Sequence, residues 1–338
     1  MTAEPSSPDP VAGQPKLAVR TQLGRADDLR AELAVEIILP PGLVTPGATV
    51  AAEAALSGPE SVRSTTLPVR LPVRFSGRRE SSTGVALTGR VVLTEPAYWT
   101  AELPMRYHLA GRLLVDGQQV AEVEEQIGLR RLGIRGHSLW LDGRRWVPRG
   151  LACGRADADL ADRRAAVHGT AVAVIDLPSA TTADGYQRFW GCLSQADREG
   201  WPLMLRLATG SPVATADGVA RLAQHPAVMA VTVPAEAVEV AAGWKKTAGT
   251  MLLAAELPGD QPPPAVLPSV DVLMVRLAAA ALPAAAWRTP LPLPVVAWQS
   301  AAEPTRAGCD RLQAALASWR LAGDRPPADW DWAGFLIG

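Results

Sequence analysis

The first half of the chain, from about residue 18 to residue 135, alternates apolar and polar side chains in short runs separated by Gly, Pro and Ser. A period of two is typical of half-buried strands in an antiparallel sheet. Asp116 and Gly117 stand between two such runs and predict a two-residue hairpin turn. This half therefore predicts an immunoglobulin-like β-sandwich, although no cysteine pair joins its sheets. The runs expected to be strands are AELAVEIILP, ATVAAEAAL, STTLPVRLPVRF, GVALTGRVVL, MRYHLAGRLLVDG and QQVAEVEEQIGLRRLGI.

After Arg145 the pattern changes to buried apolar runs that alternate with amphipathic helices, which predicts βα units and a parallel sheet. Eight such runs starting roughly 20 to 30 residues apart predict a small (β/α)8 barrel. Asp184 and Thr215 are expected to mark the starts of two of its helices. The runs expected to be strands are WVPRGLA, TAVAVIDL, PLMLRLA, AVMAVTV, TMLLAAEL, VDVLMVRL, PVVAWQ and AGFLIG.

The last of these strands reaches Gly338, the last residue of the sequence, so we expect the barrel to lack its eighth helix. An apolar groove would then lie between the first and seventh helices. Exposed apolar patches of that size are rare in monomers. We expect the amino-terminal tail, the sandwich or a second subunit to cover the groove.

The change of pattern predicts three regions. Residues 1–17 are rich in Pro and Ser, lack the charged start and apolar core of a signal peptide, and are expected to form a disordered tail. Residues 18–137 form the expected sandwich, and residues 138–338 form the expected TIM barrel. The fold class is thus a β-sandwich followed by an α/β barrel.

Composition narrows the classes of partner. The net charge is −1, and arginines and alanines far outnumber lysines, as in a GC-rich bacterial genome. No patch of Lys and Arg interleaved with aromatics indicates nucleic-acid binding, and no apolar run reaches the length of about 18 residues that a membrane span requires. Cys153, Cys192 and Cys309 lie far apart and are expected to be free thiols, not metal ligands or disulfides. We expect a soluble cytoplasmic protein without a cofactor or metal.

The segment from His225 to Glu236, HPAVMAVTVPAE, places a carboxylate at a strand end. Pro226 ends a helix, residues 227–233 form the expected buried strand, and the carboxyl ends of parallel barrel strands hold active-site groups. This segment resembles the acid/base strand of glycoside hydrolase family 2, whose pattern is His-Pro-Ser-Ile, a short apolar run and Asn-Glu. The resemblance places Glu236 at the acid/base position, with Ala235 in place of the asparagine.

A second stretch, residues 98–150, resembles the end of the sandwich in the same family and the hairpin that leads into its barrel. Leu129 and Asp142 depart mildly from the family pattern, and we expect no counterpart of the jelly-roll domain that opens typical members. We expect Trp99, Trp140 and Trp146 to pack between the domains instead of stacking on sugars. The residues that keep the family pattern are Tyr98, Trp99, Pro104, Tyr107, Gly128, Arg130, Leu141, Gly143 and Gly150.

The resemblance also indicates where a nucleophile should stand. A retaining glycosidase needs two carboxyl groups about 5 to 5.5 Å apart. In LPVVAWQSAAEP, counting from Pro294 puts Gln299 at the nucleophile position, and an amide supplies no anion to attack a sugar. Glu303 follows in the loop or first helical turn, where it is expected to support the helix amino terminus.

Other strand ends carry further candidates. The second barrel strand lacks the family's arginine and presents Asp176, and the sixth lacks its tyrosine. Asp176 and Glu256 could form a new carboxylate pair with Glu236. Arg206 could pair with any of these carboxylates or remain a solvated charge on the rim, and Trp298 could stack on a ligand or lie in the core. Asp176, Arg206, Trp298 and Glu256 are therefore the candidate ligand-binding residues.

We expect a catalytically degenerate protein that resembles the glycoside hydrolases and serves as a carbohydrate-binding or structural module. Its partner would be a carbohydrate or a protein, and a second copy of the chain could cover the groove. The alternative is an active O-glycosyl hydrolase that uses displaced carboxylates, with Glu236 as acid/base. The two differ in whether any two of Glu236, Asp176, Glu256 and Glu303 lie within reach of each other.

Overall fold

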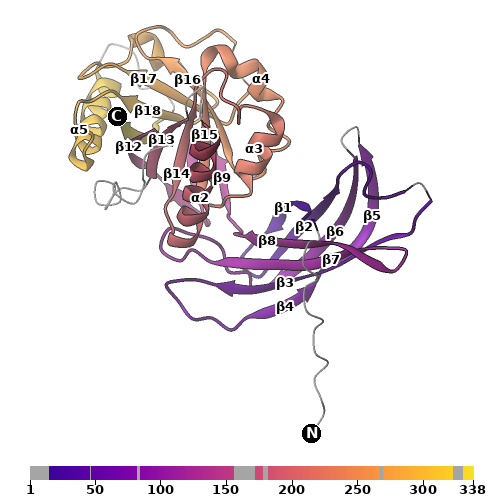
Figure 1. The fold of residues 1–338 in the computed structure, drawn as a ribbon. Helices are drawn as coiled ribbons and strands as arrows, with labels where there is room; N and C mark the ends of the chain where they lie inside the picture. The colour runs from indigo at the N-terminus through magenta and orange to yellow at the C-terminus, as the bar shows by residue number, and fades with distance from the viewer. Residues whose placement is uncertain are drawn as a thin grey trace. The chain divides into compact units, whose positions relative to one another are not determined.

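The computed structural model describes residues 15–45, 47–81, 84–155, 172–177, 182–266, 269–322 and 330–338. The chain forms two compact units (Figure 1). The first, which we call the sandwich unit, consists of the chain up to Pro59 together with Leu67–Pro96 and Tyr107–Ile127. The second, the barrel unit, consists of Glu60–Thr66, Ala97–Arg106 and Gly128–Gly338.

The first half of the chain forms two four-stranded antiparallel sheets, which confirms the predicted sandwich. Along β2 the buried residues are Ala31, Leu33, Val35, Ile37 and Leu39, so the alternation predicted from the sequence is the inner face of the sheet. One sheet has the order β1 (Ala18–Ala26), β2 (Arg30–Leu39), β6 (Gly84–Thr94), β5 (Arg74–Ser81). The other has the order β4 (Val69–Pro72), β3 (Val50–Glu60), β7 (Arg106–Val115), β8 (Gln118–Ile127).

The predicted hairpin turn joins β7 and β8. Asp116 and Gly117 have φ angles of 48° and 81°, as a type I′ turn requires at both central positions. A second turn of the same kind, at Asp142 and Gly143, joins two strands of a small sheet formed by β9 (Leu132–Arg135), β10 (Ser138–Leu141) and β11 (Arg144–Trp146). Strand β1 was not among the predicted strands, because an edge strand buries few side chains and carries a weak apolar signal.

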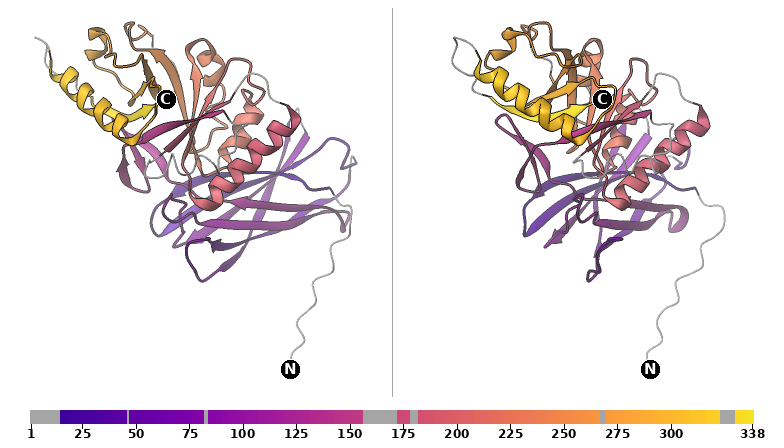
Figure 2. Two further views of the ribbon diagram at one scale, coloured as in Figure 1. Left: turned by 60° about the vertical axis from the view of Figure 1, so that its left-hand side comes forward. Right: turned by 90° about the vertical axis from the view of Figure 1, so that its left-hand side faces the viewer.

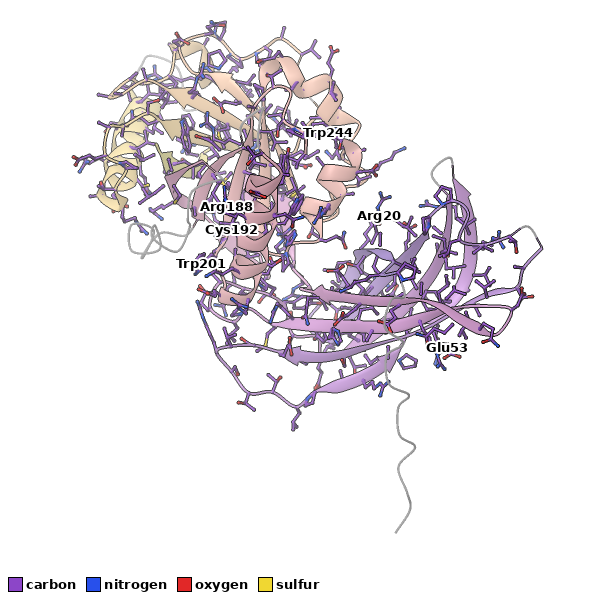
Figure 3. All side chains as sticks on the ribbon, in the orientation of Figure 1. Arg20, Glu53, Arg188, Cys192, Trp201 and Trp244 are labelled. Carbon is purple, nitrogen blue, oxygen red and sulfur yellow. The ribbon has the colours of Figure 1, made fainter. Side chains whose placement is uncertain are left out.

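The second half forms a closed barrel of eight parallel strands, and all eight predicted runs are strands (Figures 1 and 2). The barrel closes where β12 pairs with β19. In chain order the strands are β12 (Arg149–Arg155), β13 (Val172–Leu177), β14 (Leu203–Leu207), β15 (Val228–Pro234), β16 (Leu252–Pro258), β17 (Val272–Leu277), β18 (Val295–Gln299) and β19 (Trp332–Ile337). Large apolar side chains fill both units (Figure 3).

Within the described residues, the barrel unit has fewer helices than a regular (β/α)8 repeat predicts. Between β17 and β18 the chain forms only a short 3-10 helix, η2 (Ala285–Arg288). The α-helix after β15, α4 (Val238–Ala242), has only five residues. The longer helices are α2 (Ala183–Glu199), α3 (Ala216–Ala223) and α5 (Arg306–Leu321). None of the helices in the described ranges has the length and hydropathy of a membrane-spanning helix.

The helix starts were predicted with partial success. Thr215 is the N-cap of α3, as predicted, and its side chain accepts a hydrogen bond from the Gly218 amide. The expected start of α2 at Asp184 was wrong, because Thr182 is the N-cap and accepts from the Gly185 amide. Asp184 instead lies in the first turn, where its negative charge favours the helix amino terminus.

Helix α5 covers the strands beside the expected groove. It packs on both β19 and β12, where Cys309 Sγ lies 3.5 Å from the Gly150 carbonyl oxygen and Gly308 lies against Ile337. Phe335 and Ile337 are buried as a result. The other wall of the predicted groove was expected to be a helix between β12 and β13, and that prediction falls on residues 156–171, outside the described residues.

Candidate functional site

The register of the barrel strands determines which side chains face the interior. Because α5 lies against Ile337, the neighbouring Leu336 faces inward. Trp298 is the register partner of Leu336, and Arg276 is the partner of Trp298, so both side chains lie on the inner side of the barrel wall. All of these positions approach the carboxyl ends of their strands, the end at which barrel enzymes hold their active sites.

The same reasoning holds on the opposite wall. Gly150 pairs with both Leu336 and Val172, which fixes Val172 and, by alternation, Asp176 as inward-facing residues. Asp176 is the register partner of Arg206, and Arg206 is the partner of Thr232. The barrel therefore presents a ring of inward-facing side chains near its carboxyl-terminal end, which we call the mouth.

Arg206 is the centre of the polar contacts in the mouth. Its Nε and Nη2 donate to Glu256 at 2.9 to 3.1 Å, engaging both carboxylate oxygens, and its Nη1 donates to Asp176 Oδ1 at 2.9 Å. The Arg206 and Glu256 side chains are 22% and 12% exposed, whereas Asp176 is 47% exposed. A fork-shaped guanidinium suits this bidentate geometry, and a charge-assisted pair of this kind is strong where water is scarce.

Three further side chains complete the mouth. The Arg206 guanidinium carbon lies 4.5 Å from the ring centroid of Trp298, a cation–π distance. Trp298 is buried, so the structure places it in the core with one ring face against an arginine. Arg276 Nη1 approaches Glu256 Oε1 at 3.5 Å. Thr232, the register partner of Arg206 on β15, is buried, and its hydroxyl makes no hydrogen bond within the described residues. The four candidate ligand-binding residues thus lie together.

Glu236 lies apart from this cluster. Pro234, with φ −64° and ψ 157°, ends β15 in an extended conformation, and the chain turns into the 3-10 helix η1 (Ala235–Ala237). The Glu236 side chain is exposed, and its Oε1 accepts a hydrogen bond of 3.1 Å from Thr209 Oγ1. Glu236 therefore follows a barrel strand as predicted, but its hydrogen-bond partner is a hydroxyl on the neighbouring βα loop.

Gln299 ends β18, and its amide Nε2 donates to the carbonyl oxygen of Ala281 at 3.1 Å. This bond holds the glutamine side chain against the connection between β17 and β18. Glu303 is exposed in the loop that precedes Thr305, the N-cap of α5, so it lies outside the first helical turn. In the part of the chain that the structure describes, no hydrogen bond or ion pair joins Glu236, Gln299 or Glu303 to one another.

A pocket of about 340 Å³ opens beside Gln299 at the ends of β16, β17 and β18. Its polar lining consists of Asp260, Arg276 and Ser300, and these residues were not among the sequence-based candidates. Arg276 carried a usable signal, because it stands at the same strand-end position as Arg206 in a similar apolar run. The remaining lining residues are Pro258, Leu277, Ala278, Ala281 and Leu282.

His225 and Pro226, which carry the resemblance to the acid/base strand, make hydrogen bonds and packing contacts within the barrel unit. His225 Nδ1 lies 2.6 Å from Asp197 Oδ2, and Asp197 Oδ1 accepts from the Ala227 amide at 2.9 Å. Pro226 packs closely on Gly128, where an added Cβ would lie 2.3 Å from the proline ring. Asp197, which the sequence analysis did not select, thus caps the start of β15.

Arg130 donates hydrogen bonds to the backbone at the start of β15, the strand that Asp197 caps. It is 2% exposed and donates to the carbonyl oxygens of Pro226 and Val228 and to Thr250 Oγ1. Burial lowers the pKa of Arg130 to about 10, and the nearby Asp197 carboxylate opposes this shift. The guanidinium therefore remains charged at neutral pH and stabilises the beginning of β15.

The three tryptophans of residues 98–150, the segment that resembles the family, make packing contacts within the barrel unit. Trp99 is fully buried, and its Nε1 donates to the Asp197 carbonyl oxygen at 2.8 Å. Trp140 is half-buried, with the Arg135 guanidinium 4.3 Å from its ring centroid, and Trp146 packs against the hydrophobic core. None of the three lines the pocket beside Gln299.

The fold of an antiparallel sandwich followed by a closed parallel barrel is similar to that of several solved glycoside hydrolases. A glycoside hydrolase family 2 member from Bacteroides cellulosilyticus DSM 14838 matches 95% of this chain and 45% of its own, with a TM-score of 0.59 and 14% identity. A β-glucuronidase from Bifidobacterium dentium, solved with coumarin-3-O-glucuronide, matches 78% of this chain and 47% of its own, with a TM-score of 0.52 and 11% identity. A β-glucuronidase from Parabacteroides merdae matches 79% and 37%, with a TM-score of 0.50 and 14% identity.

These similarities confirm the expected resemblance to glycoside hydrolase family 2 at the level of the fold. Neither a protein-family model nor a curated protein matches the sequence. The chain spans less than half the length of each of these solved structures.

Proposed function

We propose that this protein is a catalytically degenerate relative in fold of the family 2 glycoside hydrolases and that its barrel binds a carbohydrate without hydrolysing it. The observation that supports this proposal most directly is the position of Arg206. Its guanidinium engages both oxygens of Glu256 and one of Asp176, and it occupies one face of Trp298. A sugar bound on the barrel axis would have to displace this cluster and leave charged groups unpaired.

The position of the missing nucleophile supports the same proposal. Retaining hydrolysis needs a carboxylate that attacks the anomeric carbon. The residue at that position, Gln299, has an amide that donates to Ala281 O and carries no negative charge. A substrate would meet a neutral hydrogen-bonding group at this point, which suits binding but not the formation of a glycosyl-enzyme intermediate.

The surroundings of Glu236, the acid/base position, do not suit a general acid. A general acid in a glycosidase has a raised pKa, which burial or a second carboxylate produces. Glu236 is exposed and accepts a hydrogen bond from the Thr209 hydroxyl, so it lacks the buried surroundings of such an acid. We therefore assign Glu236 a positional resemblance without the function.

Hydrolysis by displaced carboxylates is the second candidate function. One observation favours it, since Asp176 and Glu256 lie on the same guanidinium and are thus close to each other. However, Arg206 donates hydrogen bonds to both Glu256 oxygens, and this charge-assisted pairing stabilises the carboxylate and weakens it as a nucleophile. Glu303 is exposed in a loop and contributes no partner to this pair.

The pocket beside Gln299 is the binding site that we propose for the carbohydrate. Its volume of about 340 Å³ falls within the range of small-ligand sites. Asp260 accepts hydrogen bonds, Arg276 donates them and Ser300 does both, which suits the hydroxyl groups of a sugar. The apolar remainder of the lining can contact the faces of a sugar ring. The three free cysteines fit a reducing compartment, and we propose the cytoplasm.

Hydrolysis is tested with a panel of nitrophenyl glycosides and glucuronides. We expect no turnover by the wild-type protein and none by Gln299→Glu, because the surroundings of the restored carboxylate do not position a substrate. Turnover by the wild type that Glu236→Gln abolishes, and that Glu239→Gln on the exposed face of α4 preserves, would overturn the non-catalytic proposal. Turnover that Asp176→Asn abolishes would instead support displaced carboxylates.

Binding is tested by screening the purified protein on a glycan array and titrating any glycan that binds. We expect Asp260→Ala and Ser300→Ala to weaken binding about tenfold each, as the loss of one or two hydrogen bonds to a ligand does. Arg311→Ala, on the exposed surface of α5, is the matched control and should leave binding unchanged. A protein that binds no glycan in the screen would favour a protein partner and a purely structural role.

A further inference from the structure

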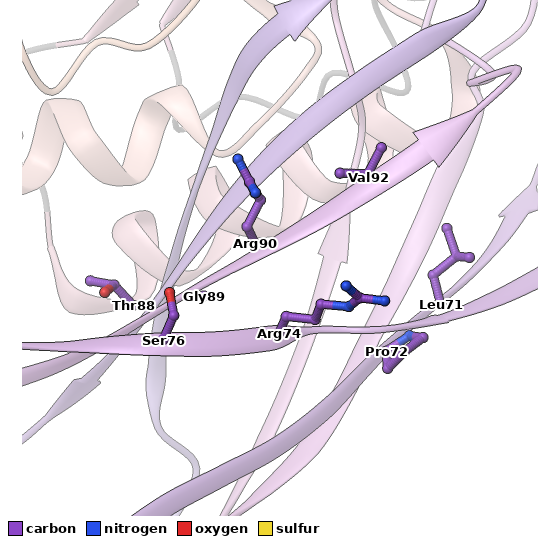
Figure 4. Close-up of a pocket in the computed structure, with 8 residues that line it drawn as sticks. All are labelled: Leu71, Pro72, Arg74, Ser76, Thr88, Gly89, Arg90 and Val92. Carbon is purple, nitrogen blue, oxygen red and sulfur yellow. The ribbon is translucent and has the colours of Figure 1, made fainter.

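A larger cavity lies in the sandwich unit. It has a volume of about 730 Å³ and is lined by strands β4, β5 and β6 (Figure 4). Its lining contains two arginines, two hydroxyl residues and no carboxylate. The lining residues are Leu71, Pro72, Arg74, Ser76, Thr88, Gly89, Arg90 and Val92.

The two arginines face each other across neighbouring strands. Arg74 of β5 is the direct register partner of Arg90 of β6, so both side chains project from the same face of the sheet. Like charges at directly opposed positions destabilise an antiparallel pair. The sheet therefore has an unfavourable charge arrangement that a bound anion would relieve.

The surrounding residues neutralise this pair only in part. Arg74 forms no ion pair in the described part of the chain. The carboxylate that approaches Arg90 is that of Glu32, at 3.9 Å, and Glu32 is already paired with Arg30 at 3.1 Å. The Arg90 side chain is 65% exposed, so its guanidinium is accessible to a ligand.

The backbone around the cavity departs from regular pairing. Between Phe75 and Gly77 the register of β5 shifts against β6, which makes Ser76 the extra residue of a β-bulge. Bulges of this kind reorient a side chain and are common beside binding sites. Ser76 and Thr88 both line the cavity and add hydroxyl donors beside the two guanidinium groups.

We propose that this cavity binds a small organic anion that carries a phosphate or carboxylate group. The two arginines would contact the oxyanion, since a guanidinium pairs with either group through two parallel hydrogen bonds. Leu71, Pro72 and Val92 would contact the remainder of the molecule. The volume exceeds what an inorganic anion fills and lies in the range of small-ligand sites. This site is independent of the carbohydrate pocket in the barrel unit.

The test is calorimetric titration of the full chain with glucose 6-phosphate, glucuronate, inorganic phosphate and glucose. We expect one of the two organic anions to bind at least about tenfold more tightly than glucose and than inorganic phosphate, with affinity falling as salt rises. Which of the two binds better distinguishes a phosphate from a carboxylate ligand. Comparable binding of all four, or binding of neither organic anion, would overturn the proposal.

Substitutions locate the site. Arg74→Ala and Arg90→Ala should each weaken binding about tenfold, and Arg90→Lys should recover only part of the loss because lysine lacks the planar fork. Arg112→Ala is the matched control, an exposed arginine on β7 of the other sheet that pairs with Glu53. An equal loss of affinity in Arg112→Ala, or no loss in either cavity variant, would show that the anion binds elsewhere or only through general charge.

Discussion

The cluster around Arg206 makes a quantitative prediction about the stability of the barrel unit. Replacing Arg206 with methionine removes the Nε and Nη2 donors that bind both oxygens of the Glu256 carboxylate. The Glu256 side chain is 12% exposed. Breaking a buried ion pair in this way costs about 3 to 5 kcal/mol. Arg276 remains 3.5 Å from Glu256 and retains part of the interaction, so we expect a loss of about 2 to 3 kcal/mol. Asp176 is half-exposed and adds little, since exposed ion pairs contribute about 1 kcal/mol or less.

A second substitution isolates the pair. Glu256→Gln should destabilise the barrel unit by about 1 to 2 kcal/mol, because Arg206 keeps Asp176 as a partner. The double variant should be less destabilised than the sum of the two single variants, with a coupling energy of about 1 to 2 kcal/mol. Arg311→Met, on the exposed surface of α5, is the control and should change stability by about 0.5 kcal/mol or less.

Tryptophan fluorescence during urea unfolding measures these changes in the barrel unit alone. All 11 tryptophans lie at or after residue 99, in segments of the barrel unit, so the sandwich unit contributes no tryptophan signal. A loss of about 2 to 3 kcal/mol should also lower the thermal midpoint by about 4 to 12 °C for a unit of this size. If Arg206→Met changes stability no more than the control, or if the two single effects simply add, then the bidentate pair with Glu256 does not form in solution.

Three further predictions concern the packing of the barrel unit. Arg130→Met should destabilise it by about 2 to 4 kcal/mol in the same urea assay, because two buried carbonyl oxygens lose their donor; an unchanged midpoint would contradict the observed bonds. Gly128→Ala should cost about 1 to 3 kcal/mol, since its Cβ would lie 2.3 Å from a proline ring carbon, whereas Gly133→Ala, whose Cβ meets nothing within 4 Å, should cost less than half as much. Burial raises the pKa of the Cys309 thiol, so iodoacetamide at pH 8 should modify half-buried Cys192 (Figure 3) first, and faster labelling of Cys309 would argue against its burial between α5 and the barrel strands.

Much of the architecture was predictable because it depends on local patterns. Apolar alternation in AELAVEIIL predicted β2 and its buried face, since successive side chains of a strand point to opposite sides. Asp116 and Gly117 predicted a type I′ hairpin, since both residue types tolerate positive φ angles. The apolar runs from β12 to β19 predicted eight buried parallel strands, since strands covered on both sides are apolar along their whole length.

Predictions were less accurate where local signals are weak or compete. Strand β1 was missed because only one of its nine residues is buried at the edge of the sheet. Thr182 and Asp184 both favour a helix amino terminus, and the backbone conformation selected the threonine as the cap. The position of α5 over both β19 and β12 depends on packing between distant segments, which periodicity does not encode.

The candidate site divides in the same way. The sequence by itself placed Asp176, Arg206, Glu256 and Trp298 at the carboxyl ends of four strands, because strand length and alternation fix where each run ends. Only the closed barrel decided that these residues meet, since the register between strands brings Asp176 beside Arg206 and the curvature of the wall brings Glu256 and Trp298 to the same guanidinium. The sequence left Arg206 with several possible partners. The tertiary structure selected them because a buried guanidinium must satisfy its donors with whichever carboxylates the barrel places within reach.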